Sequence, residues 1–63
     1  MIVNYTIQEV DGQPEVLPVL EVKIEEHEIW CNIQYAENDI EWHVVDIEDI
    51  YDSEANAYNA FVY

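Results

Sequence analysis

Hydrophobic and polar residues alternate along most of this chain, which is the pattern of half-buried β-strands. In the first segment Val3, Tyr5 and Ile7 alternate with polar residues, so these three side chains are expected to face a core. The alternation resumes over residues 19–25 and again over residues 28–35. A period of two that recurs in this way predicts a sheet of antiparallel strands.

Short polar segments separate the strands and predict their turns. Residues 11–12 (Asp-Gly) form a strong two-residue hairpin sequence, and residues 26–27 (Glu-His) fit a second hairpin tip. Residues 36–39 (Ala-Glu-Asn-Asp) predict the next turn. Pro14 and Pro18 lack a backbone donor, so the stretch that contains them is expected to stay out of any central strand.

The pattern changes phase in the second half of the chain. Ile40, Trp42 and Val44 continue the alternation, and then Val45 and Ile47 take over the apolar positions. Two adjacent apolar residues inside an alternating segment indicate a β-bulge.

The C-terminal segment fits two structures. We favour a hairpin loop followed by a strand that returns toward Tyr63. The alternative is a short helix capped by Ser53, because the alanines favour helix and the aromatic residues have suitable spacing. The expected fold is mostly β: a small antiparallel meander or barrel of four to five strands in a single domain over residues 1–63. The alternative is an α+β fold with a short C-terminal helix over residues 53–62.

The composition indicates that the chain folds. Of its 63 residues 51% are hydrophobic and 13% are aromatic, whereas a disordered acidic chain would be poor in both. This length leaves room for one domain. Cys31 is the only cysteine, so an internal disulfide is excluded, and its place in an apolar row predicts a buried side chain.

The net charge is the strongest functional clue. The chain has fifteen Asp and Glu residues, a single Lys and no Arg, which gives a formal net charge of −14. A chain of this length should be about 27 Å across, and B-form DNA of that length carries about 16 negative charges. A magnitude of roughly 2 to 8 is enough to keep a small domain soluble. The charge therefore points to a basic partner, and one Lys excludes direct binding to nucleic acid.

The carboxylates concentrate in two segments, eight of them within residues 37–54 and a smaller group around His27. Alternate residues of a strand share a face and lie about 6.6 Å apart, so Glu37, Asp39 and Glu41 are expected to form one acidic row. Tryptophans are interleaved with these acids, and aromatic side chains often anchor protein interfaces. We expect an acidic-aromatic face to bind the partner through Glu25, Glu26, Glu28, Trp30, Glu37, Asp39, Glu41, Trp42, Asp46, Glu48, Asp49, Asp52 and Glu54.

No residues stand out for catalysis, metal binding or a cofactor. His27 and His43 are not in a ligand spacing that is typical of metal sites, and Ser53 has no histidine close to it in the sequence. With so many carboxylates, a pair suited to acid–base chemistry is expected by chance. We therefore expect a binding protein rather than an enzyme.

The N-terminal residues lack the basic region and long apolar run of a signal peptide, and no apolar segment is long enough to span a membrane. We expect a cytoplasmic protein, in a bacterial host cell if a phage encodes it. In size and charge it resembles the small acidic inhibitors that phages and mobile elements direct against restriction, CRISPR or DNA-repair enzymes. That resemblance implies a nucleic-acid mimic which blocks a basic DNA- or RNA-handling protein. The alternative is an acidic structural or adaptor module that assembles with a basic protein, and a homodimer is compatible with either.

The excess of like charge predicts that the folded protein is stabilised by salt. Screening weakens repulsion among exposed charges, and the small core gives a narrow stability margin. The melting temperature should rise as sodium chloride is added, as measured by circular dichroism. A melting temperature that is indifferent to ionic strength would contradict the clustering of these charges.

Overall fold

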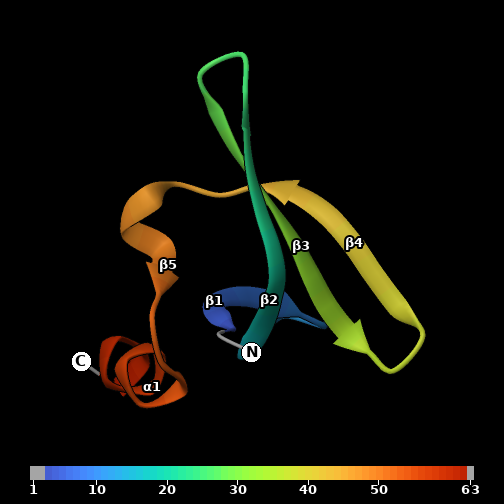
Figure 1. Ribbon diagram of the computed structural model, residues 1–63. Coiled ribbons are helices and arrows are strands. Elements are labelled where there is room, and N and C mark those ends of the chain that lie inside the picture. Colours follow the sequence, from blue (N-terminus) through green and yellow to red (C-terminus); the bar gives the residue numbers. More distant parts are fainter. Residues whose placement is uncertain (1–2, 63) are drawn as a thin grey trace.

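The structure, a computed structural model, describes residues 3–62 apart from the side chain of Val62. A single sheet in the order β4-β3-β2-β1-β5, antiparallel at every pairing, forms most of the molecule (Figure 1). The expected antiparallel β fold is confirmed. Its elements are β1 (Asn4–Val10), β2 (Gln13–Glu25), β3 (Glu28–Ala36), β4 (Asp39–Val44), the 3₁₀ turn η1 (Ile47–Asp49), β5 (Ile50–Tyr51) and the helix α1 (Glu54–Val62).

The C-terminal segment is the helix α1, so the returning strand that we favoured is wrong. The hydroxyl Oγ of Ser53 accepts a hydrogen bond of 3.1 Å from the backbone N–H of Asn56, and the Asp52 carboxylate accepts one of 2.6 Å from the Asn56 side chain. Ser53 therefore caps the helix by accepting from a free N–H of its first turn, as the alternative over residues 53–62 predicted. The predicted path of the strand at Tyr63 lies outside the described residues.

The predicted turns are confirmed. Residues 11–12 close the hairpin between β1 and β2 with positive φ angles of 53° and 78°. Residues 26–27 close the next hairpin with φ angles of 51° and 70°, although neither is glycine. Residues 37–38 join β3 to β4. The hairpin of β2 and β3 projects beyond the rest of the sheet (Figure 1), and near its tip Ile24 is 73% exposed.

β2 lies at the centre of the sheet, contrary to the expectation from its two prolines. In a two-residue hairpin the pair that closes the turn is hydrogen-bonded, and such pairs recur at every second residue. Pro14 and Pro18 fall between these pairs, so their nitrogen atoms point away from β1. On that side the ladder to β3 begins only at Val19. No backbone hydrogen bond of the sheet therefore needs a proline N–H.

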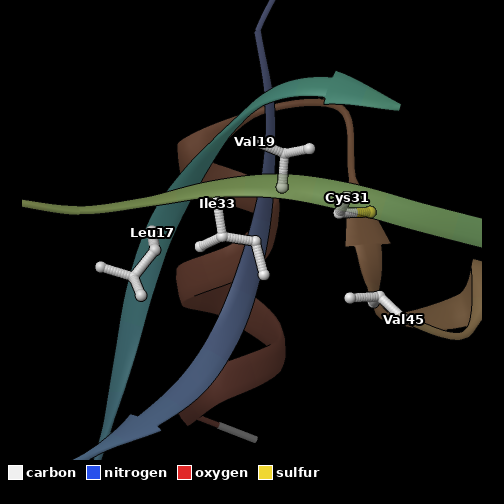
Figure 2. Close-up of a cluster of buried hydrophobic side chains, with 5 residues drawn as sticks. All are labelled: Leu17, Val19, Cys31, Ile33 and Val45. Carbon is white, nitrogen blue, oxygen red and sulfur yellow. The ribbon is translucent and has the colours of Figure 1, made fainter. Parts of the chain in front are cut away.

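The main core lies on one face of β2 and β3 (Figure 2). Val45 reaches this core from the segment that leaves β4, and its backbone N–H donates a 3.0 Å hydrogen bond to the carbonyl of Ile29. The cluster consists of Leu17, Val19, Cys31, Ile33 and Val45.

The predicted phase break at Val45 is therefore the end of β4 rather than a bulge within it. Ile47 does not join the core and is 71% exposed. The irregularities of the sheet lie elsewhere, between Val19 and Glu21 in β2 and between Gln34 and Ala36 in β3.

β1 presents Thr6 to the main core, contrary to the expectation that Tyr5 and Ile7 would face it. Thr6 is fully buried opposite Leu17, and its hydroxyl donates a 2.9 Å hydrogen bond to the carbonyl of Asp49. Tyr5 and Ile7 alternate with Thr6 and are half-buried on the other face. Helix α1 contacts β1, β2 and β5, and in Figure 2 it lies on the far side of β1 from the labelled core. Both faces of β1 are thus covered, which a pattern of alternation cannot show.

The core location predicts the cost of truncating its centre. Ile33 is fully buried, so Ile33→Ala should lower the free energy of unfolding by about 2–5 kcal/mol. Ile47→Ala removes the same atoms from an exposed side chain and should change stability by no more than about 0.5 kcal/mol. Urea unfolding of both variants measures the difference. Similar losses in the free energy of unfolding would mean that Ile33 is not at the centre of the core.

Candidate partner-binding surface

All fifteen acidic side chains are exposed. Lys23, the only Lys or Arg in the chain, already has partners: its Nζ lies 3.0 Å from Oε2 of Glu25 and 4.5 Å from the ring centroid of Trp42. The only other ion pair within residues 3–62 joins Nε2 of His43 to Oε1 of Glu41 at 3.1 Å. Thirteen of the fifteen carboxylates therefore have no ion-pair partner among residues 3–62, and all are exposed to water.

The dense acidic segment 37–54 does not lie on a single strand. It begins at the turn before β4 and ends at the first residue of α1, which follows β5, and β4 and β5 are the two opposite edges of the sheet. Glu37 lies in the turn, Asp39 and Glu41 lie in β4, and the five remaining acids follow β4. These five are Asp46, before η1; Glu48 and Asp49, in η1; Asp52, before α1; and Glu54, in α1.

The smaller acidic group lies at the tip of the projecting hairpin. Glu25 ends β2, Glu26 is in the turn, and Glu28 begins β3 directly opposite Glu25. The structure thus places the predicted binding residues in separate regions: the hairpin tip, the β4 edge, and the segment that leads to α1.

Asp39 and Glu41 share one face of β4, as the expected row requires, whereas Glu37 lies before the strand. A hydrogen bond to the Glu41 carboxyl, partial desolvation and the charge of Glu41 raise the pKa of Asp39. On the same face the rings of Tyr35 and His43 meet edge to face, 5.8 Å between centroids. Burial, then the charges of Glu41 and Asp39, raise the pKa of Tyr35. We call Asp39 and Glu41 the acidic row.

The opposite face of β4 is apolar and largely uncovered. Ile40, Trp42 and Val44 are 45%, 36% and 45% exposed, and Trp30 of β3 stands opposite Val44 in the ladder. We call these four residues the apolar strip. Trp30 alternates with the fully buried Cys31, as predicted from its phase. Helix α1 packs on β1, β2 and β5 and leaves this part of the sheet open.

Ile40 and Val44 were not predicted as surface residues. Their alternation with acids was visible, but nothing in it shows which face of β4 is covered. That choice is made by Val45, which enters the core immediately after the strand. The role of Lys23 beside Trp42 was missed for a similar reason, because the two residues meet only through the pairing of β2, β3 and β4.

The described residues 3–62 offer neither a pocket nor a cluster of three side chains suited to hold a metal ion. Burial raises the pKa of the Cys31 thiol, which keeps it protonated and poorly reactive. In the part of the chain that is described, no helix is long and apolar enough to cross a membrane. No protein-family model, curated protein or solved structure matches this chain.

The acidic row predicts a pH-dependent gain in stability for Asp39→Asn. The raised pKa of Asp39 means that its contribution to stability is present below its ordinary pKa and is lost as the pH rises through the raised value. The asparagine variant carries no charge beside Glu41 at any pH. Its melting temperature should exceed that of the wild type at pH 7, and the difference should shrink at pH 3.

The matched control is Glu15→Gln, which removes one charge from an exposed position of β2. It should raise the melting temperature at pH 7 by less than Asp39→Asn. Equal gains would mean that net charge alone matters, and a loss of stability in Asp39→Asn would contradict the repulsion within the row.

Proposed function

We propose that this protein is a small inhibitor that occupies the Lys- and Arg-lined nucleic-acid groove of a DNA- or RNA-handling protein. It acts by occupancy rather than by catalysis, and its carboxylates take the place of phosphates. One observation carries the proposal: all fifteen carboxylates are exposed, and the single Lys of the chain is already held by Glu25 and Trp42.

The size of the molecule agrees with this role. Its longest dimension is 32 Å, and B-form DNA of that length carries about 19 phosphate charges. The net charge of −14 is of the same order. The carboxylates are carried by a folded domain, on its strands, turns and helix, so the partner does not have to bend or order the ligand, and a preorganised ligand binds with a smaller entropic cost.

The electrostatics predict how the complex would form. Oppositely charged surfaces steer association and make it fast at low salt. Charge alone gives little specificity. Trp42, which is 36% exposed on the face of β4 opposite the acidic row, supplies an aromatic contact of the kind that anchors interfaces. Within a nucleic-acid groove such a ring can also replace a stacked base.

The target class is a protein whose normal ligand is nucleic acid. A phage or mobile-element protein directed against a bacterial restriction, CRISPR or DNA-repair enzyme fits this chemistry, and such an inhibitor would work in the cytoplasm. Because the molecule is itself strongly anionic, its partner must present a surface of opposite charge.

A second candidate function is that of an acidic adaptor module that assembles with a basic protein without displacing nucleic acid. The observation that favours it is the uncovered apolar strip next to a sheet edge, which suits strand addition by another protein.

A competition experiment separates the two functions. The chain is immobilised and incubated with a bacterial lysate at 50 mM salt. Mass spectrometry then identifies the proteins that are released at 500 mM salt. Each is then bound to a fluorescent duplex or RNA, and unlabelled protein is added while anisotropy is followed. The inhibitor must displace the nucleic acid in a one-to-one, salt-sensitive manner. Undiminished nucleic-acid binding at saturating protein would reject the inhibitor and favour the adaptor.

Charge removal tests which carboxylates contact the partner. The triple variant Glu37→Gln, Asp39→Asn, Glu41→Gln should weaken the complex about tenfold more than a triple variant in the hairpin of β1 and β2, because three contacts would be lost. The matched control is Glu9→Gln, Asp11→Asn, Glu15→Gln, which removes the same charge and the same residue types. Titration calorimetry measures both affinities. Equal losses would show that only the net charge matters.

A further inference from the structure

β4 is the open edge of the sheet. At the opposite edge β5 is two residues long and is followed by α1, which contacts it. β4 has six residues, and within residues 3–62 its extensive contacts are with β3 alone. Natural edge strands are usually protected by charged side chains, lysine above all, or by proline or a bulge. The charged residues of β4 are Asp39 and Glu41. The sequence of β4, Asp-Ile-Glu-Trp-His-Val, contains no lysine or proline, and its ladder to β3 is regular from Ile40 to Val44.

The backbone of β4 shows which of its residues are available for pairing. The bond from the Val45 N–H to the Ile29 carbonyl makes that pair a hydrogen-bonded one, and hydrogen-bonded pairs alternate along an antiparallel ladder. His43 and Glu41 therefore bond to β3. The N–H and C=O groups of the residues between them, Trp42 above all, point outward at the free edge.

We propose that a second copy of this chain pairs with β4 across a twofold axis at Trp42, which joins two five-stranded sheets into one. In this antiparallel register Trp42 lies opposite Trp42 of the second copy, Ile40 lies opposite Val44, and Glu41 lies opposite His43. The outward backbone groups of both copies are satisfied, and the apolar strips become continuous on one face. On the other face the Glu41–His43 pair that exists within each chain meets its counterpart, so each carboxylate also lies opposite the imidazole of the second copy.

Charge and side-chain direction select this register over its neighbours. A shift by one residue would place the apolar strip of one copy on the same face as the acidic row of the other. A shift by two residues in one direction would set His43 opposite Asp39 but also Glu41 against its own copy. The same shift in the other direction would set His43 against its own copy and leave Glu41 opposite Val45, without an imidazole. Like charges directly opposite each other destabilise a sheet. Only the register centred on Trp42 matches the charges and the apolar residues together.

The net charge opposes this dimer, since each copy carries −14. Salt screens that repulsion, so added salt should tighten the dimer, whereas it should weaken the complex with a basic partner. This opposite response separates the dimer from the proposed function, on which it does not depend.

Sedimentation velocity tests the proposal on the wild-type chain over about 5–500 µM, at 0.15 M and 0.5 M sodium chloride. A monomer–dimer equilibrium that shifts toward dimer at the higher salt is expected. A protein that stays monomeric at every concentration and both salt levels would overturn the proposal. Backbone amide shifts give a second readout. If the β4 signals shift when a basic protein is added but do not shift with the concentration of the chain itself, the proposal is also overturned.

Substitution of His43 tests the surface. His43→Lys should tighten the dimer about tenfold because two lysine–glutamate pairs form, and His43→Glu should weaken it by a similar factor. The controls are His27→Lys and His27→Glu, which change the net charge equally at the hairpin tip. A dimer that responds to both histidines alike would reject β4 as the interface. Thermal melts show that each variant is folded.

Oxidative cross-linking tests the register. Hydrogen-bonded antiparallel pairs have Cα atoms about 5.5 Å apart, within the range of a disulfide. Trp42→Cys should therefore form a disulfide-linked dimer, whereas Ile40→Cys should not, because its own copy lies several residues away. The buried Cys31 of the wild type is the background control. Faster cross-linking of Ile40→Cys than of Trp42→Cys would contradict the register.

Discussion

The carboxylates of this protein must remain in water, because the chain has only one Lys or Arg with which to pair them. A buried carboxylate without a partner would be neutralised or would destabilise the fold. All fifteen are accordingly exposed, and Thr6 is the one polar side chain buried among the described residues. The interior is left to a few small and aliphatic side chains, and the fold must cover them with one curved sheet and one short helix.

With so few apolar side chains in the interior, the two faces of the sheet are covered to different extents. The main core on β2 and β3 is closed by Val45 from the segment between β4 and β5. The helix covers the other face only at β1, β2 and β5, where Ala57 is fully buried. The other face of β4 therefore stays open, with the apolar strip there and the acidic row on the opposite side of the strand. The same edge strand thus combines charge, aromatic area and free backbone groups.

Much of the fold follows from the sequence, because alternation and turn residues are local. β1, β3, β4 and the second half of β2, the turns at residues 11–12 and 26–27, and the outward phase of Trp30 were predictable, whereas β5 and the first half of β2 were not. The rest depends on tertiary pairing. The prolines of β2 are tolerated because their nitrogens face a part of the strand without a partner. Thr6 replaces Tyr5 in the main core because Asp49 offers it a carbonyl acceptor. The candidate surface was predictable as a set of acids, but its division between two sheet edges was not.

We propose that the exposed carboxylates stand in for phosphates. The most direct measurement is hydrogen exchange of the captured target protein, recorded free, with nucleic acid, and with this protein. The same Lys- and Arg-rich segments of the target should be protected by both ligands, and high salt should remove both protections together. Protection of separate segments, with the nucleic-acid groove still open to exchange, would contradict this proposal.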